Sequence, residues 1–488
     1  MKNNIIKQQG MYYRNIVFYI ILLFSTFSYA QIGIGNTLPQ ATLDITASNQ
    51  AAPTNEDGLL IPRIDDFPST PPTAAQNGML VYLTTTVGLN TKGFYHWDQV
   101  NGWTRLSSIE KLNDLSDAKS DVDGSEDGSS IFIGIDAGAN DDGNDRRNIG
   151  IGYRALNANT NADHNSAFGY ASLENNTTIS GNSGNNNSAF GYVAMRENTT
   201  GQGNSAFGKR ALENNTIANH NTAFGADALG NNNPVSNNSG GSANSAIGNA
   251  ALSNNTTGNE NVALGNLALT TNVSGDNNTA VGTEALTNNF DSSNNTAFGY
   301  GALKQNISGN NTAIGSYAGE LIASNDNLSS SNVIIGYLSG NELDGSNNVL
   351  VGQQSGRYLE GDLNVFLGRQ AGRDNKGSSN VFIGNRAGFN GAWDLVSNTL
   401  VIQNESSATP LIYGDFTSGR VGIAKTASTH ALEIEGTTEA TQYKLSALNT
   451  APASASDTGT VGEIRVTATY IYICTAANTW VRAALSTW

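Results

Sequence analysis

The chain has 488 residues but little cysteine, little charge and few basic side chains. Its single cysteine, Cys474, excludes a disulfide within the chain and a zinc site built from cysteines. Only 14% of the residues are charged, and 41 acidic residues against 25 basic ones give a formal net charge of −16. Such a balance repels phosphates, and the net charge per residue is too low for a typical disordered chain. We therefore expect a folded protein that does not bind nucleic acid.

Long apolar runs are also scarce. The most pronounced one, Ile16 to Phe27, follows three basic residues and ends at the small-residue pattern Ser28-Tyr29-Ala30. The run is shorter than the roughly twenty residues that a membrane-spanning helix needs. Basic, apolar and small residues in this order are typical of a signal peptide. We expect residues 1–30 to be removed near Ala30, and the mature chain, without a membrane-spanning segment, to be secreted, either extracellular or on a bacterial cell surface.

The chain is rich in glycine, with 54 residues, and the glycines follow a repeat. The pattern is Asn, then Ser, Thr or Val, then two further small or apolar residues, then Gly, as in Asn204-Ser205-Ala206-Phe207-Gly208. Copies lie mostly 16 or 17 residues apart, which is too short for a helix plus a strand but fits a short strand with a tight turn. The closing glycines are Gly134, Gly152, Gly169, Gly191, Gly208, Gly225, Gly248, Gly265, Gly282, Gly299, Gly315, Gly336, Gly352, Gly368 and Gly384. The repeat predicts an all-β protein with a parallel β-solenoid over residues 131–402.

At two positions of the repeat the sizes of the side chains vary inversely. In the earlier copies Ala or Gly stands two residues before the closing glycine and Leu or Met four residues after it, as in Ala206 and Leu212. In the later copies a large residue comes first and Gly second, as in Phe382 and Gly388. A constant summed volume indicates that the two positions share one packed space. That space lies either within a coil or across a subunit boundary.

The run Asn-Ser-Ala-Phe-Gly-x-x-Ala-Leu at residues 204–212 resembles the head repeats of trimeric autotransporter adhesins, and similar repeats occur in phage-like tail fibres. The resemblance implies a left-handed parallel β-roll with three chains side by side. Each coil also offers few large apolar side chains, which is a thin core for a free monomer. We therefore expect a homotrimer.

The flanks of the repeats resemble each other. Residues 31–45 are similar to residues 420–434, and each stretch is followed by a small module with a late tryptophan. We assign residues 31–106 to an N-terminal β module, residues 107–130 to a linker rich in Ser and Asp, residues 403–436 to a neck and residues 437–488 to a C-terminal β module. Related modules at both ends are expected as caps of a solenoid.

Two groups of side chains are candidate binding sites, and no cofactor site is indicated. An acidic cluster in the linker could hold Ca²⁺ or be a solvated segment; it comprises Asp117, Asp121, Asp123, Glu126 and Asp127. A tyrosine column directly after the closing glycines could stack on sugars or pack between subunits; it comprises Tyr153, Tyr170, Tyr192 and Tyr300.

The sequence contains no zinc-protease motif H-E-x-x-H and no serine-hydrolase motif with a plausible acid and histidine, so we expect a protein that is not an enzyme. The leading hypothesis is a secreted or cell-surface, fibrous, adhesin-like structural protein whose partners are cells, glycans or surface receptors. One alternative is a receptor-binding tail fibre of a phage-like particle or injection system. Another is a β-helical polysaccharide-active enzyme, which requires carboxylates clustered on one face of the solenoid.

Overall fold

A computed structural model describes residues 32–35, 37–38, 41–47, 51–52, 58–106, 115, 117–120, 129–142, 144, 146–177, 183–234, 240–322, 329–427 and 429–486. The chain divides into two units, residues 1–114 and residues 115–488. The expected signal peptide lies outside the described residues. Among those residues, no helix combines the length and the hydropathy needed to span a bilayer.

The first unit contains two small sheets. Strands β1 (Ile32–Ile34) and β2 (Leu43–Ile45) form a parallel pair. A second sheet holds β3 (Arg63–Ile64), β4 (Leu80–Leu83), β5 (Gly93–Asp98) and β6 (Gly102–Arg105), with the short 3-10 helix η2 (Ala74–Gln76) before β4. Alternation along β4 and β5 buries Val81, Leu83 and Tyr95 on one face, where Phe67 and Trp103 pack against them.

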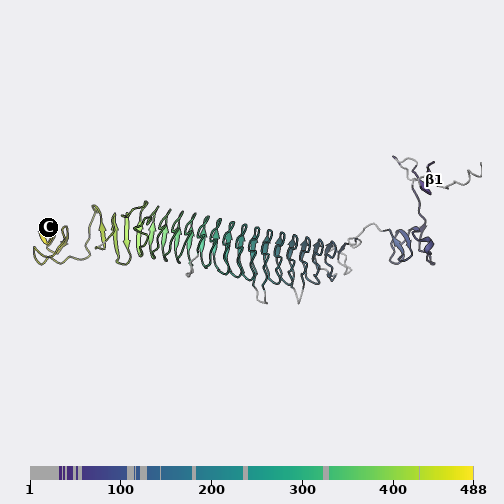
Figure 1. Cartoon of the computed structure of the whole chain (residues 1–488), viewed down its shortest axis with the longest axis horizontal. Helices are drawn as coiled ribbons and strands as arrows, with labels where there is room; N and C mark the ends of the chain where they lie inside the picture. The colour runs from purple at the N-terminus through teal and green to yellow at the C-terminus, as the bar shows by residue number, and fades with distance from the viewer. Residues whose placement is uncertain are drawn as a thin grey trace, which may run out of the picture. The chain divides into compact units, whose positions relative to one another are not determined.

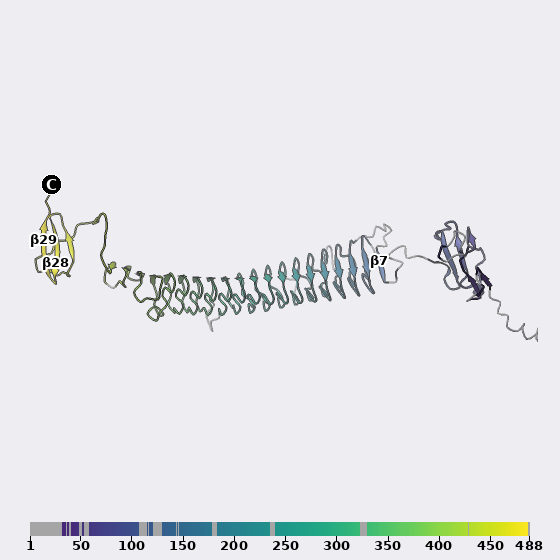
Figure 2. The same ribbon diagram turned by 90° about the horizontal axis from the view of Figure 1, so that it is seen from above.

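The second unit is dominated by a ladder of short parallel strands, whose coils follow one another in a single row (Figure 1, Figure 2). Strand β7 (Ala118–Ser120) pairs antiparallel with the first of them. Within the described residues the parallel strands are β8 (Ile131–Ile133), β9 (Ile149–Ile151), β10 (Ser166–Phe168), β11 (Ser188–Phe190), β12 (Ser205–Phe207), β13 (Thr222–Phe224), β14 (Ser245–Ile247), β15 (Val262–Leu264), β16 (Thr279–Val281), β17 (Thr296–Phe298), β18 (Thr312–Ile314), β19 (Val333–Ile335), β20 (Val349–Val351), β21 (Val365–Leu367), β22 (Val381–Ile383) and β23 (Thr399–Ile402). Each pairs in register with the equivalent strand of the next coil, as Ala189 does with Ala206. The predicted parallel β-solenoid is confirmed, whereas its left-handed sense stays a prediction.

The ladder ends in two antiparallel strands and a further parallel one. Strand β23 pairs with β24 (Ile412–Asp415), β24 with β25 (Arg420–Ile423), and β25 runs parallel to β26 (Leu432–Ile434). A separate antiparallel sheet follows, built from β27 (Ile464–Val466), β28 (Tyr470–Ala476) and β29 (Thr479–Ala484). Its core side chains include Cys474 and Trp480, both buried, and the thiol of Cys474 is free.

Two features require glycine at the position that closes each strand: the backbone conformation and the close approach of the next coil. The fifteen glycines have φ between +118° and +146°, a region that side chains with a Cβ rarely adopt. At Gly265 an added Cβ would lie 2.5 Å from the carbonyl oxygen of Gly282. The close approach is therefore between successive coils of one chain.

The interior of each coil is filled by side chains of the same chain. In an early coil Ala206, Ala211 and Leu212 are all fully buried. In a late coil Phe366 is fully buried, and a Cβ added at Gly372 would lie 2.2 Å from its ring. The two positions that exchange bulk therefore share their space within one coil. Leu212 and Gly372 also adopt similar left-handed conformations, with φ of +51° and +55°, so the backbone accommodates either residue.

Buried asparagines form two ladders along the solenoid. In the first, the backbone N–H of each ladder residue donates to a side-chain oxygen of the previous coil, as when the amide of Asn278 donates to Oδ1 of Asn261 at 2.9 Å. The fully buried members are Asn148, Asn165, Asn187, Asn204, Asn221, Asn244, Asn261, Asn278, Asn295, Asn311, Asn332, Asn348, Asn364 and Asn380. A ladder of amides satisfies the polar groups that a narrow interior would otherwise leave unpaired.

The second ladder stops where the coils change type. It joins side-chain amides directly, from Asn159 to Asn306, as when Nδ2 of Asn272 donates to Oδ1 of Asn255 at 2.9 Å. In the next three coils the equivalent position is apolar and buried, occupied by Ile322, Leu343 and Leu359. The late coils are not uniform at this position, because the following coil again carries a buried asparagine, Asn375.

Candidate functional site

The predicted tyrosine column is a stack of three rings. The ring centroids of Tyr153 and Tyr170 lie 5.1 Å apart, and those of Tyr170 and Tyr192 lie 5.3 Å apart, with interplanar angles of 20° and 16°. Tyr300 does not join this stack but meets Tyr317 edge-on. Because stacked rings cover each other's faces, the middle ring presents only its edge to solvent. A sugar that stacks on a ring face would find such a face only at the ends of the column.

A second aromatic column lies on the outer face of the strands. Phe168, Phe190, Phe207 and Phe224 stack with centroids 4.6 to 5.6 Å apart. Apolar residues continue this column in later coils, and many are more than a third exposed, including Ile247, Leu264, Phe298, Ile314 and Leu367. The outer face of the ladder is thus apolar over much of its length, as expected of an interaction surface.

Carboxylates gather beside a cavity of about 480 Å³ on the late coils. We call this cavity the acidic groove. Its lining residues are Gln305, Leu321, Glu342, Leu343, Asp344, Tyr358 and Glu360. Backbone amides of one coil donate to carbonyls of the next, as Asp344 does to Leu359 at 2.8 Å, so equivalent positions lie one above the other.

The carboxyl groups of Asp344 and Glu360 in the acidic groove have different surroundings. Partial burial and the nearby carboxylates of Glu360 and Asp362 raise the pKa of Asp344. Glu360 itself accepts a hydrogen bond from Nζ of Lys376 at 2.5 Å. A carboxyl with a raised pKa beside a second carboxyl group is an arrangement suited to acid–base chemistry.

The sequence analysis missed the acidic groove. A usable signal was present, because residues 344, 360 and 376 recur at the 16-residue spacing of the late coils and therefore line up on one face. The carboxylates on one face that the enzyme alternative requires are present on these coils, where Glu342, Asp344 and Glu360 line one cavity.

The predicted calcium cluster falls largely outside the described residues. Of its members only Asp117 is described, and Asp121, Asp123, Glu126 and Asp127 are not. In the part of the chain that the structure describes, no group of three histidine, cysteine or acidic side chains could hold a metal ion. The calcium site stays a prediction.

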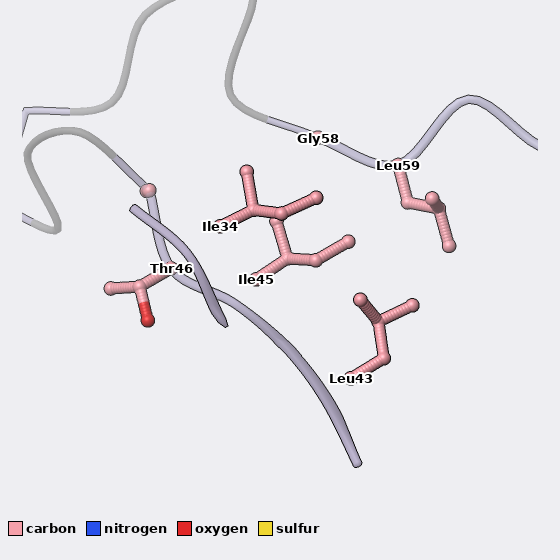
Figure 3. Close-up of a pocket in the computed structure, with 7 residues that line it drawn as sticks. Ile34, Leu43, Ile45, Thr46, Gly58 and Leu59 are labelled. Carbon is pink, nitrogen blue, oxygen red and sulfur yellow. The ribbon is translucent and has the colours of Figure 1, made fainter. Parts of the chain in front are cut away.

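The parallel pair of the first unit borders a cavity of about 550 Å³ that is lined by aliphatic side chains and by Thr46. Ile34, Leu43 and Ile45 point into the same space, which Leu59 borders from the following segment (Figure 3). Ile34 and Leu43 are 54% and 50% exposed, so half of each side chain lacks a partner within the described chain. We call this surface the N-terminal apolar face.

Comparison with known proteins gives two likenesses. Residues 32–123 match a family described as phage tail like trimerisation region. A stretch of 37 residues is 54% identical to the depolymerase of Klebsiella phage K64-1 that is specific for capsule K30/K69. This match covers 8% of the chain and only 5% of that relative. No solved structure matches significantly.

The likeness to a capsule depolymerase corrects one expectation. The prediction that the chain is not an enzyme is wrong in the light of this match. The prediction rested on missing sequence motifs, but cleavage of a glycosidic bond needs only two suitably spaced carboxyl groups. Asp344 and Glu360 line the same cavity from different coils, so no contiguous motif marks them. Both likenesses favour the phage-like side of the resemblance, and the autotransporter head type stays an expectation.

Proposed function

We propose that this chain is a structural protein of the phage tail-fibre type, which assembles as a homotrimer and attaches to surface polysaccharide. The observation that carries the proposal is the match of residues 32–123 to a phage tail like trimerisation region, directly ahead of a long β-solenoid. The exposed apolar column on the strands and the N-terminal apolar face supply surface for contact between chains. Three copies would multiply weak glycan contacts, which is the adhesin-like part of the proposal.

The assembly is tested by the mass of the purified protein in solution. Sedimentation equilibrium is expected to give three times the mass of one chain. A stable monomer with native β-structure would refute the trimer. Binding is tested with the trimer on an array of bacterial surface polysaccharides, and an array without any specific signal would refute attachment to glycans.

We further propose that the protein acts outside the cytoplasm after removal of residues 1–30. The support is the order of basic, apolar and small residues in that segment. Expression of the whole chain in a bacterium, followed by fractionation and intact mass measurement, is expected to yield an exported chain that begins at Gln31. An uncleaved chain confined to the cytoplasm would refute this part.

Polysaccharide cleavage is a second candidate function, favoured by the acidic groove and by the depolymerase likeness. In hydrolysis the carboxyl of Asp344, in its protonated form, would be the proton donor to the glycosidic oxygen as the bond to the anomeric carbon breaks; its raised pKa favours that form. The carboxylate of Glu360 would take a proton from the attacking water, whose hydroxyl joins that carbon. The two groups then hold the roles of acid and base.

The cleavage candidate is tested by incubating the protein with a panel of capsular polysaccharides and measuring new reducing ends. Asp344→Asn and Glu360→Gln are each expected to lower the rate at least a hundredfold. Glu260→Gln, which changes an exposed carboxylate on an early coil, is the control and is expected to leave the rate unchanged. Cleavage that persists in both groove variants would exclude this site, and a panel without cleavage would refute the candidate.

A further inference from the structure

The parallel pair β25–β26 repeats the backbone pattern of β1–β2. In β1–β2, Ile32 lies opposite Leu43, and in β25–β26, Val421 lies opposite Leu432, so both pairings join residues eleven positions apart. The flanking hydrogen bonds also agree. The amide of Thr46 donates to the carbonyl of Ile34 at 2.9 Å, and that of Glu435 donates to Ile423 at 3.0 Å. The similarity between residues 31–45 and 420–434 is therefore a similarity of structure.

Each pair has one apolar face. Because side chains alternate along a strand, the C-terminal pair places Val421, Ile423, Leu432 and Ile434 on one face and Gly422 and Glu433 on the other. The N-terminal pair likewise places Ile32, Ile34, Leu43 and Ile45 together, opposite Gly33 and Asp44. Glycine, acid and apolar residues occupy the same places in both pairs.

In the C-terminal pair the polar face is already occupied by its own connecting loop. A Cβ added at Gly422 would lie 2.1 Å from the carbonyl oxygen of Lys425, and the Nζ of Lys425 lies 2.9 Å from Oε2 of Glu433. The apolar face stays open, with Leu432 58% exposed and Ile434 and Val421 each 37% exposed. We call this surface the C-terminal apolar face.

The occupant of the C-terminal apolar face follows from its N-terminal counterpart. Strands β1 and β2 lie within the segment that matches a phage tail like trimerisation region. A surface with the same residues in the same register is suited to the same partner. We propose that β25–β26 is a second self-association unit, in which the C-terminal apolar faces of three copies of this chain pack together.

This unit is joined to the end of the solenoid, because β25 pairs with β24 and β24 pairs with the last parallel strand, β23. The inference rests on the proposed homotrimer and adds that the three chains associate independently through two units, one before and one after the solenoid in the sequence. Loss of one unit then weakens the trimer without dissolving it.

The test uses the full chain with two sets of substitutions and a local probe. One variant carries Leu43→Asp and Ile45→Asp, a second carries Leu432→Asp and Ile434→Asp, and a third carries all four. Glu435→Cys in a Cys474→Ser background, labelled with pyrene, reports by excimer fluorescence whether the C-terminal pairs of different chains meet. Sedimentation equilibrium gives the dissociation constant of each variant.

We expect the N-terminal variant to stay trimeric with its pyrene excimer retained. The C-terminal variant is expected to lose the excimer. Its trimer is expected to dissociate at a protein concentration more than tenfold higher than that of the parent chain. The combined variant is expected to be monomeric. Leu448→Asp is the matched control, because Leu448 is 59% exposed and lies outside both pairs; it is expected to change neither readout. Should the aspartate variants misfold by circular dichroism, Leu432→Ser with Ile434→Thr replaces them.

Two results would overturn the inference while leaving the homotrimer intact. One is a trimeric parent chain without excimer at position 435. The other is a combined variant that dissociates no more than the N-terminal variant. A monomeric parent chain would instead refute the proposed homotrimer itself.

Discussion

Exchange of bulk within one coil can be tested at Phe366 and Gly372. Phe366→Ala removes a fully buried ring and is expected to destabilise the chain by about 3–5 kcal/mol. Gly372→Leu alone inserts a side chain whose Cβ would lie 2.2 Å from that ring. Overpacking of this kind costs roughly 1–3 kcal/mol, and a left-handed backbone adds about 1–2 kcal/mol for a residue with a Cβ.

The double variant converts the coil to the early type, with Ala before the closing glycine and Leu after it. The cavity and the overlap then cancel, and about 1–2 kcal/mol of backbone strain is left. Individual costs of roughly 5–10 kcal/mol in total would be replaced by a much smaller one, so the coupling energy should exceed about 3 kcal/mol.

Denaturant unfolding measures the global stability of the four chains. Hydrogen exchange of peptides from residues 365–388 reports the same coil locally, because a repeat protein can open in part. Additive effects of the two substitutions would refute the shared space. So would a double variant whose local protection is no better than that of Phe366→Ala.

Three further predictions concern the backbone, the ladder and the acidic groove. Gly265→Ala is expected to lower the stability in thermal unfolding by more than about 4 kcal/mol. Gly436 has a similar φ of +134° but no atom within 4 Å of an added Cβ, so Gly436→Ala should cost only about 1–3 kcal/mol. Equal costs would refute the role of the close approach. Asn261→Ala leaves a buried N–H and a buried carbonyl without partners and should cost about 2–4 kcal/mol in denaturant unfolding. Asn214→Ala, which removes only a solvent-exposed hydrogen bond to Oδ1 of Asn231, is the comparison and should cost less than about 0.5 kcal/mol. A small effect of Asn261→Ala would contradict the ladder. The raised pKa of Asp344 means that its ionised form is disfavoured in the folded chain. Asp344→Asn should therefore raise the melting temperature at pH 7, and this gain should shrink as the pH falls toward 3. A gain that persists at pH 3 would exclude the charge of Asp344 as its cause.

The solenoid could be predicted because each coil carries its structure in a few adjacent residues. Asparagine, a three-residue strand and glycine occur in order, and their recurrence fixes the parallel register. The exchange of bulk was also readable, because the paired positions are six residues apart in one chain. Local order and repetition together substitute for an alignment.

The acidic groove and the second ladder were harder to predict. Asp344 and Glu360 belong to different coils, and nothing in either local sequence shows that they face the same space. The apolar residues Ile322 and Leu343 that replace the second ladder accompany a small strand residue, Ala313, in one coil and a large one, Ile334, in the next. Such relationships depend on packing between coils, which a repeat pattern describes only on average.

The in-register pairing of like with like has a consequence for the length of the protein. Ser188 pairs with Ser205 and Ala189 pairs with Ala206, so successive early coils present nearly the same residues to the coils on either side of them. A gene duplication or deletion of one whole coil would therefore rejoin matching surfaces and change the length by the spacing of one strand, about 4.8 Å. Reach toward a target surface can thus evolve in small, fixed steps, with each new junction already compatible with its neighbours.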